Sequence, residues 1–349
     1  MGTLGYFLLV IGPLIFIHEL GHFLVAKWRG VRVERFSLGF PPRLFGFKRG
    51  DTDYCVSAVP LGGYVKMAGE NPEEDVAGAP DEYTSKSPGA RALIIIAGPA
   101  MNYLLAFVLY VGVIFVGGDL KVVDSGLRVG EMTPEWPAQA AGLMTGDQIL
   151  AIDGEPVADF EALKAYIGPR GGEPITLTVL RGADTLVLAL TPRAAADPQS
   201  GTTEGKIGIY PMTAFESVGF GPALKAGAEA TWQNTVMVGN FFFRFVSGRE
   251  SPRNIGGPLF IASIAGQVAE QGWRYFIGFM AILSINLAIL NVLPIPALDG
   301  GQLLFILIER IKGKPLSVKQ RMAVQQVGLA FLLVLIIFVT INDIVRVLS

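Results

Sequence analysis

The sequence has little of the residue types that form crosslinks or bind metals. Among its 349 residues there is one cysteine, Cys55, and there are two histidines, His18 and His22. A single cysteine excludes a disulfide within the chain and excludes a zinc finger built from several cysteines. Any chemistry that needs histidine must therefore use the same two side chains, which stand four residues apart.

Charged side chains are also scarce. They make up 17% of the chain, against about 25% in typical soluble proteins, while hydrophobic residues make up 51%. The formal net charge is −2, and the sequence has no basic stripe with interleaved aromatic residues, so we expect no nucleic acid as a partner. The composition indicates a protein embedded in the lipid bilayer.

Four apolar stretches are long enough to cross a bilayer, which takes about 20 helical residues. They lie at about 4–26, 92–116, 275–293 and 327–347. The first has neither the basic start nor the small-residue cleavage site of a signal peptide. The sequence therefore predicts a polytopic α-helical membrane protein with four transmembrane helices.

Lysine and arginine gather in two of the connections between these stretches. Lys27, Arg29 and Arg32 follow the first stretch, and Arg310 and Lys312 lie between the third and the fourth. Because such residues concentrate on the cytoplasmic side, we expect both connections there. Both termini and the long segment between the second and third stretches are then expected on the opposite, extracytoplasmic side.

Residues 28–91 are expected to form a cytoplasmic loop with a small membrane-associated β element. Residues 32–70 contain runs with strand character and a turn at Gly62-Gly63, which predicts a β hairpin or curved sheet. Residues 71–90 are acidic and rich in Pro, Gly and Ser, which predicts a mobile loop.

The sequence of residues 118–195 predicts a compact α+β domain. Strands are expected at 128–132, 175–180 and 185–190, and helices at 137–143 and 160–167. The pattern of residues 136–157 resembles that of PDZ domains attached to bacterial proteases, so the inserted domain is expected to be PDZ-like. Helical periodicity at 218–245 predicts either an amphipathic helix on the outer membrane face or a packed linker.

The chain is therefore expected to divide into consecutive parts. These are transmembrane helix 1 at 1–27, the cytoplasmic loop with the hairpin at 28–91, transmembrane helix 2 at 92–117, the PDZ-like domain at 118–195, an extracytoplasmic linker with the amphipathic helix at 196–273, transmembrane helix 3 at 274–300, a cytoplasmic loop at 301–326 and transmembrane helix 4 at 327–349.

The sequence His18-Glu19-Leu20-Gly21-His22 has the form H-E-x-x-H. Residues four apart share one face of a helix, so both imidazoles can reach one ion. Glu19 points about 100° away around the helix, which suits a base that acts on a zinc-bound water rather than a third ligand. Because ionisable side chains within a transmembrane helix mark functional sites, the motif predicts a catalytic zinc centre.

A catalytic zinc ion needs a third protein ligand, and a carboxylate or Cys55 could supply it. Pro294 and Pro296 should unwind the end of the third stretch, and Asp299 follows that break, before two glycines that permit close backbone approach. Asp299 is expected at the same depth as the two histidines, and we therefore predict it as the third ligand. Asp343 is expected near the opposite face of the membrane. Glu309 is on the correct side but lies ten residues past the break.

The H-E-L-G-H motif, together with N-x-x-P-x-P-x-L-D-G at residues 291–300, resembles the motifs of the site-2 protease family of intramembrane zinc metalloproteases. The PDZ-like insertion and the sequence Gly98-Pro99-Ala100-Met101-Asn102 look like the bacterial RseP branch, although this chain has room for a single PDZ domain and the best-known members carry two. The resemblance implies zinc bound by His18, His22 and Asp299, with Glu19 as the catalytic acid and base.

The resemblance also implies how a substrate is held. Asn291 would hold the substrate backbone or the oxyanion, and Asn102 and the Gly256-Gly257-Pro258 turn would help shape the site. The hairpin from Tyr54 to Met67, with Val56, Gly62 and Gly63, would pair with an unwound substrate segment. The implied substrates are single-span membrane proteins such as anti-sigma factors or signal-peptide remnants, already cut on the outside of the bacterial cytoplasmic (inner) membrane, and the PDZ-like domain would bind peptide ends or filter by size.

Two other classes of function fit parts of the sequence. A catalytically silent scaffold could bind peptides through the PDZ-like domain, but a scaffold has no need of Glu19. A zinc transporter typically spreads polar groups along a path through the membrane, whereas here the polar groups are expected at one depth. The sequence therefore favours a membrane zinc metalloendopeptidase that carries out regulated intramembrane proteolysis.

Overall fold

A computed structural model describes residues 2–70, 78–123, 126–196, 203–251, 255–314 and 316–348. It divides into two compact units. Unit 1 comprises Met1–Gly117 and Gly219–Ser349, and unit 2 comprises Gly118–Val218. Residues 71–77 of the loop predicted at 71–90 lie outside the described residues. Tyr83, later in that loop, is buried, and its backbone N–H donates a hydrogen bond to the carbonyl group of Ala68.

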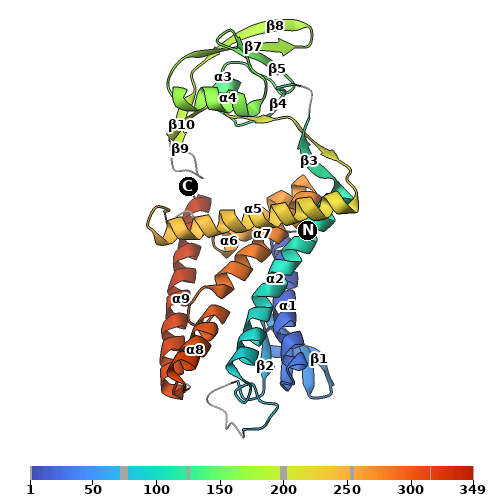
Figure 1. The fold of residues 1–349 in the computed structure, drawn as a ribbon, viewed down its shortest axis with the longest axis vertical. Coiled ribbons are helices and arrows are strands. Elements are labelled where there is room, and N and C mark those ends of the chain that lie inside the picture. The colour runs from blue at the N-terminus through green and yellow to red at the C-terminus, as the bar shows by residue number, and fades with distance from the viewer. Residues whose placement is uncertain are drawn as a thin grey trace. The chain divides into compact units, whose positions relative to one another are not determined.

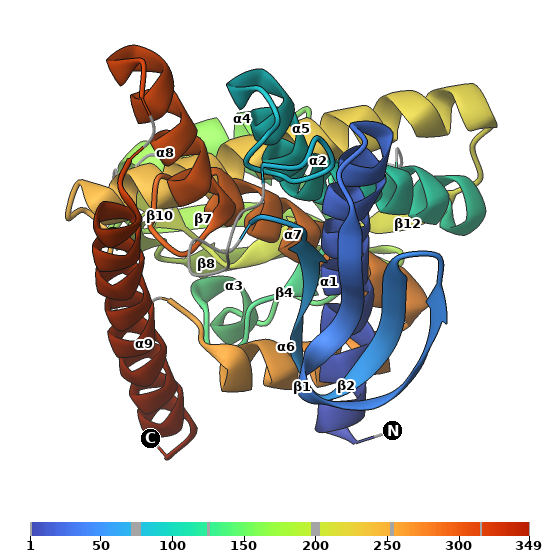
Figure 2. The ribbon, with the colours of Figure 1, turned by 90° about the horizontal axis from the view of Figure 1, so that it is seen from below.

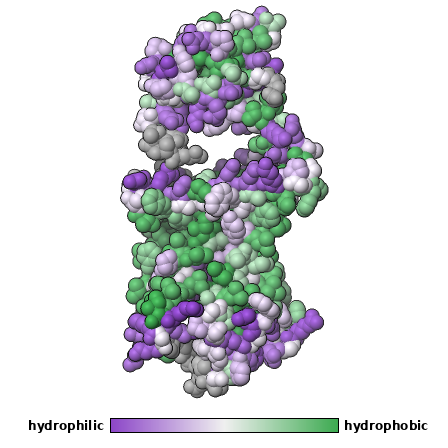
Figure 3. Space-filling model, viewed as in Figure 1, coloured by the Kyte–Doolittle hydropathy of each residue, from purple (hydrophilic) through white to green (hydrophobic). Residues whose placement is uncertain are grey.

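Unit 1 is a bundle of helices (Figure 1). Its helices are α1 (Thr3–Trp28), α2 (Pro88–Gly117), α5 (Phe220–Val246), α6 (Pro258–Gln271), α7 (Trp273–Val292), α8 (Asp299–Lys312) and α9 (Val318–Leu348). Four of them, α1, α2, α7 and α9, are long and apolar enough to cross a membrane. Figure 3 shows a hydrophobic band over this bundle with hydrophilic surface at its two ends. The prediction of four membrane helices is confirmed at this level.

Two of the predicted boundaries differ from the observed helices. Helix α7 ends at Val292, because Pro294 and Pro296 follow and cannot continue it. The predicted loop at 301–326 is largely helical, since α8 occupies 299–312 and α9 begins at Val318. The first residues of α9 are mostly polar, so the helix begins before the apolar stretch from which it was predicted.

Helices α1 and α2 approach closely through small residues. A methyl group added at Gly21 of α1 would meet the carbonyl group of Ala97 on α2 and, at 2.9 Å, the Met101 side chain. Lipid tails are as apolar as leucine, so helices inside a bilayer associate through close packing of small residues rather than through the hydrophobic effect. This crossing fixes the position of the first helix against the second.

Helix α5 confirms the helical periodicity predicted at 218–245, and it packs against the bundle. Val238 of α5 shares a buried cluster with Ala106 and Tyr110 of α2 and with Ala281 and Ile285 of α7. The opposite face keeps large apolar side chains such as Trp232 and Phe243 exposed. The helix therefore packs on the bundle and keeps part of its apolar surface exposed.

The β element of unit 1 consists of the long strands β1 (Val33–Arg49) and β2 (Thr52–Met67), which lie beside α1 (Figure 2). Both strands bend, so that the hairpin forms a small sheet of four short segments. Residues 33–38 pair with 63–67 on one side and with 53–56 on the other, and 53–56 pair in turn with 45–48. Residues 63–67 and 45–48 are consequently the two edges of this small sheet.

Unit 2 is an α+β domain. Its elements are β3 (Asp119–Val122), β4 (Val129–Met132), α3 (Pro137–Ala140), β5 (Gln148–Ile152), β6 (Glu155–Pro156), α4 (Phe160–Ile167), the short 3-10 helix η1 (Gly168–Arg170), β7 (Ile175–Arg181), β8 (Asp184–Leu190), β9 (Arg193–Ala196), β10 (Thr203–Lys206), β11 (Ile209–Pro211) and β12 (Thr213–Glu216). The largest sheet has the order β6-β5-β7-β8. Alternate residues of β7, namely Ile175, Leu177 and Val179, face a buried core. The unit extends beyond the predicted end at 195, because β11 and β12 return to pair with β4 and β3.

Asp343 of α9 has a structural role at the start of α6. Its carboxylate is 1% exposed and accepts hydrogen bonds from the backbone N–H groups of Gly257 and Phe260, both at 3.0 Å. The first N–H groups of a helix have no partner within the helix, so the aspartate satisfies donors that would otherwise be buried unpaired. The Gly256-Gly257-Pro258 segment is therefore the capped beginning of α6.

We expect Asp343→Ala to lower the free energy of unfolding of unit 1 by about 2 kcal/mol, because the cap is lost and two buried N–H groups lose their acceptor. Asp343→Asn, which keeps one acceptor oxygen, should lose less. Denaturation of the purified protein in detergent, followed by circular dichroism, measures both variants. Equal stability of the parent and the alanine variant would contradict this role.

Candidate metal centre

Three donor atoms from two distant parts of the chain meet inside unit 1. The Nε2 atoms of His18 and His22 on α1 lie 3.2 Å apart, and the Oδ2 atom of Asp299 on α8 lies 3.1 Å and 3.4 Å from them. Both histidines are 8% exposed. This cluster matches the sequence prediction that Asp299 joins the two histidines, and it is the one potential metal-binding group found among the described residues.

The three atoms fit a small tetrahedral cation. Zinc bonds of about 2.0–2.1 Å in a tetrahedron place neighbouring ligand atoms about 3.3 Å apart, and the three separations here are 3.1, 3.2 and 3.4 Å. The Oδ2 atom of Asp299 is buried and makes no hydrogen bond, an arrangement that an ion would satisfy. Three protein donors leave a fourth position for water or substrate, as in catalytic zinc sites.

Helix α2 orients the ring of His22. The Nδ1 atom of His22 lies 2.9 Å from the backbone carbonyl of Ile94, and an N–H at Nδ1 must be the donor because a carbonyl only accepts. The neutral ring then keeps a lone pair on Nε2, which faces Asp299. A hydrogen bond from the second ring nitrogen is the usual way in which proteins fix the tautomer of a metal-binding histidine.

Asn102 holds the ring of His18 in the same manner. Its side-chain amide is fully buried and lies 3.2 Å from the Nδ1 atom of His18, and its Oδ1 atom has no hydrogen-bond partner. The O and N atoms of an amide are assigned from such contacts, and exchanging them lets Oδ1 accept from Nδ1–H while Nε2 stays free for a metal. Asn102 therefore contacts a predicted ligand, which places it behind the metal site rather than at the substrate.

The break after α7 carries Asp299 into position. Ala297 adopts a positive φ of 77°, and α8 starts at Asp299 itself. A side chain at Gly300 would collide with the backbone carbonyl groups of Val292 and Leu293, and one at Gly301 would meet the carbonyl oxygen of Ile295 at 2.6 Å. Both glycines are required by this tight turn. The negative charge of Asp299 in the first turn is also favoured by the helix dipole.

Glu19 lies close to the three donors and contacts the β element. A methyl group at Gly63 would meet the Cγ atom of Glu19 at 3.0 Å and the backbone oxygen of Ser37 at 2.9 Å. The backbone N–H of Val65 interacts with the Glu19 carboxylate. The carboxylate is thus placed between the metal cluster and the edge strand at 63–67.

The other predicted contact residues fall in different places. Tyr54 and Val56 lie in an inner segment of the sheet, where the backbone pairs on both sides, and the Tyr54 ring packs on Phe23, Phe36 and Phe47. Gly62 and Gly63 lie next to or on the edge segment. Asn291 lies in the last turn of α7, shortly before the break that leads to Asp299.

The alternative ligands have other surroundings. Cys55 is buried within the inner segment of the sheet and is not part of the donor cluster. Glu309 forms ion pairs with Arg91 and Arg321. Arg91 and the Ile94 carbonyl group were not predicted from the sequence as neighbours of the site, because no sequence motif marks a backbone carbonyl.

Outside the membrane helices, burial raises the pKa of Glu70 to about 7, so this nearby carboxyl group is not a permanent negative charge at neutral pH.

The model of peptidase family M50 matches residues 6–335 of this chain. The chain belongs to peptidase family M50. Zinc metalloprotease RasP of Geobacillus kaustophilus is 32% identical over 97% of this chain and 96% of its own length. A protein of Agrobacterium fabrum that is assigned by name to the zinc metalloproteases is 37% identical, over 98% of this chain and 96% of its own length.

Family membership confirms the predicted resemblance to the site-2 proteases and the prediction of a peptidase.

Among solved structures, the PDZ domain of an SdrC-like protein from Listeria monocytogenes is similar to part of the chain. It is 26% identical, covers 26% of this chain and 92% of its own, and has a TM-score of 0.22.

Gly98 of α2 offers a direct test of the metal centre. A methyl group there would meet the rings of both His22 and His18, the latter at 2.9 Å. Such overpacking costs about 1–3 kcal/mol, so we expect Gly98→Ala to weaken zinc binding about tenfold or more. Zinc affinity, measured by chelator competition, is the readout. Gly112→Ala on the same helix adds its methyl group to open space and should leave the affinity unchanged; equal affinities for all three proteins would argue against the centre.

Proposed function

We propose that this M50 family member is a zinc-dependent intramembrane endopeptidase, with zinc held by His18, His22 and Asp299 and with Glu19 as the catalytic acid and base. The observation that carries the proposal is the cluster of three donors inside an apolar helix bundle, with the Glu19 carboxylate beside it. Ionisable groups at such a depth are costly and are kept where they serve a function.

The residues present can support hydrolysis of a peptide bond. Zinc would supply Lewis-acid activation of water and of the scissile carbonyl group. Glu19 accepts a proton from the water molecule as its oxygen bonds to the carbonyl carbon, and it later gives that proton to the amide nitrogen as the C–N bond breaks. Ile94 and Asn102 keep the two imidazoles in the orientation that points Nε2 at the metal.

The edge segment at 63–67 supports a mode of substrate binding. Its residues pair with 33–38 on one side, and Glu19 lies against Gly63. A peptide bond inside a helix is shielded by the helix, so a substrate must unwind, and pairing with a strand edge would satisfy its freed backbone groups. Gly62 and Gly63 are the proposed contact points, with Asn291 at the end of α7 as a further polar contact. The positions of Tyr54 and Val56 favour a supporting role within the sheet.

The proposed substrates are single-span membrane proteins already cut outside the membrane, such as anti-sigma factors or signal-peptide remnants. The four apolar helices support a location in a lipid bilayer, and the lysines and arginines of the two short connections favour an orientation with the active site towards the cytoplasm. We place the protein in the bacterial inner membrane with both termini outside.

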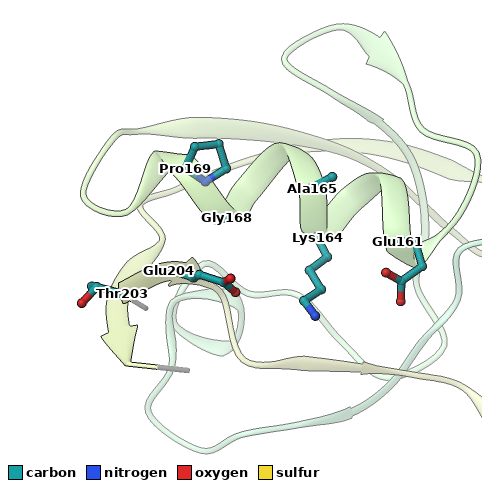
Figure 4. Close-up of a pocket in the computed structure, with 7 residues that line it drawn as sticks. All are labelled: Glu161, Lys164, Ala165, Gly168, Pro169, Thr203 and Glu204. Carbon is teal, nitrogen blue, oxygen red and sulfur yellow. The ribbon is translucent and has the colours of Figure 1, made fainter. Parts of the chain in front are cut away.

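Unit 2 would act on the substrate as a PDZ-like domain outside the membrane. It has a pocket between α4 and β10 (Figure 4). The pocket is lined by Glu161, Lys164, Ala165, Gly168, Pro169, Thr203 and Glu204. A groove beside a strand and a helix suits the binding of an extended peptide end. Cleavage that is independent of this pocket would favour a size filter instead.

The variant Glu19→Gln should keep zinc and lose cleavage, because the three ligands remain while the proton acceptor is gone. The loss should be about 10²–10⁴-fold in kcat, the usual contribution of general acid–base catalysis. Zinc content and cleavage of a single-span model protein in detergent are measured on the same preparations. Cleavage at the parent rate by the variant would refute the assigned role of Glu19.

The variant Asp299→Ala should lose zinc, since two histidines remain where catalytic sites use three protein ligands. We expect metal content well below that of the parent, which should hold about one zinc ion per chain. Asp81→Ala serves as the control, because Asp81 forms an exposed ion pair with Arg32 away from the cluster. Parent-like zinc content in Asp299→Ala would show that Asp299 is not a ligand.

A further inference from the structure

One face of α2 contacts both histidines of the candidate metal centre and helix α8. Arg91, Ile94, Gly98 and Asn102 are spaced by three, four and four residues, so they form a single stripe along the helix. Ile94 and Asn102 bond to the two histidines, and Gly98 lies against both rings. Arg91, at the start of this stripe, contacts the helix that carries the third donor.

Arg91 pairs with Glu309 of α8. Its Nη2 atom is in direct contact with the Oε1 atom of Glu309, and the two side chains are 5% and 14% exposed. Arg321 of α9 approaches the second carboxylate oxygen at 3.5 Å. Two arginines from different helices thus face one carboxylate of α8, and Arg91 and Arg321 line one pocket together with Gln302 and Gln325.

Helix α8 needs such a contact because its start is not a continuation of α7. The break between Val292 and Asp299 separates the two helices, so the direction of α8 is set by what it packs against. Asp299 and Glu309 lie about 15 Å apart along the axis, from ten residues at about 1.5 Å each. A small tilt of the Glu309 end therefore changes the direction in which the first turn presents Asp299.

Apolar packing alone does not fix this direction. Ile306 of α8 is buried in one cluster with Ile94 and Ile95 of α2. Such contacts are not directional and tolerate sliding, whereas an arginine–carboxylate pair has a fixed geometry. The pair thus fixes how α8 lies along α2. Helix α8 bears the donor Asp299, and α2 bears the groups that hold the rings of the other two donors.

We propose that the Arg91–Glu309 pair is a positioning element for the metal centre: it fixes α8 against α2 and so holds Asp299 in line with His18 and His22. The proposal rests on the proposed function, because it concerns the affinity of that zinc site. Neither residue touches the metal or the substrate, and both act through the placement of Asp299.

The test is a double-mutant cycle read out as zinc affinity. The parent, Arg91→Gln, Glu309→Gln and the double variant are purified in detergent, and zinc dissociation constants are measured by chelator competition. Loss of a residue that orients a metal ligand typically costs about 10–100-fold in affinity. We expect each single variant to lose affinity in this range. The double variant should lose less than the product of the two single losses, because both changes remove the same contact.

Two further measurements separate positioning from general destabilisation. Arg91→Lys, which keeps the charge but not the planar guanidinium, should regain only part of the affinity that Arg91→Gln loses. The absorption spectrum of the cobalt-substituted protein should change in Arg91→Gln, because the ligand geometry at the metal changes. Arg181→Gln is the matched control, since it breaks an ion pair with the buried Asp147 in unit 2, where Arg181 also lowers the pKa of Asp147; its zinc affinity and cobalt spectrum should equal those of the parent.

The possible outcomes are distinct. A parent protein that binds no zinc would overturn the proposed function itself. Zinc binding by the parent with equal affinity in Arg91→Gln, a double-variant loss equal to the product of the single losses, or an equal loss in Arg181→Gln would each overturn the positioning role and leave the proposed function standing.

Discussion

The close crossing of α1 and α2 is the contact on which the metal centre depends. Gly21 lets the α1 backbone approach the Ala97 carbonyl group, and Gly98 lets the two histidine rings lie against α2. Only at this separation can the Ile94 carbonyl group and the Asn102 amide reach the second nitrogens of His22 and His18. Because polar groups inside an apolar bundle must find partners within the protein, this crossing satisfies the rings and directs both Nε2 atoms to one point.

The position of the third donor depends on a break in the helical structure between α7 and α8. Pro294 and Pro296 end α7, and the chain then turns through Ala297 at a positive φ before α8 begins at Asp299. The carbonyl groups freed by this break lie against Gly300 and Gly301, where side chains would exclude them. The residues of the break are half-buried or exposed, and its freed carbonyl groups pack against the first turn of α8. The same turn places a carboxylate at a helix N-terminus, where negative charge is favoured.

The donor cluster could be predicted from the sequence because few residues could form it. With two histidines four residues apart, and one aspartate after a proline-broken helix, the choice was narrow before any fold was known. Part of unit 2 was also predicted, namely β4, β7, β8, α3 and α4, since β7 and β8 alternate and α4 has an aspartate cap at Asp159. The prediction did not include β5, which is the inner partner of β7. The starting point of α9 was not, because its first residues are polar and hydropathy does not mark them. The inner position of Tyr54 and Val56 was equally hidden, since the glycines and prolines of β1 and β2 mark bends but do not say which segments pair across them.

The residues that support the donors were the hardest to predict, and the reason is physical. A ligand is identified by its own chemistry, whereas a support is defined by its distance to a ligand. The backbone carbonyl of Ile94 could belong to any residue, and Arg91 could serve equally as a cytoplasmic flanking charge. Both acquire a role only through the register of α2 against α1 and α8. A register error of one residue on α2 would rotate this stripe by about 100°, which would remove all its contacts with the site at once. The positions of the donors and of their neighbours on α2 are therefore one geometric condition, which the packing of α1, α2 and α8 meets together.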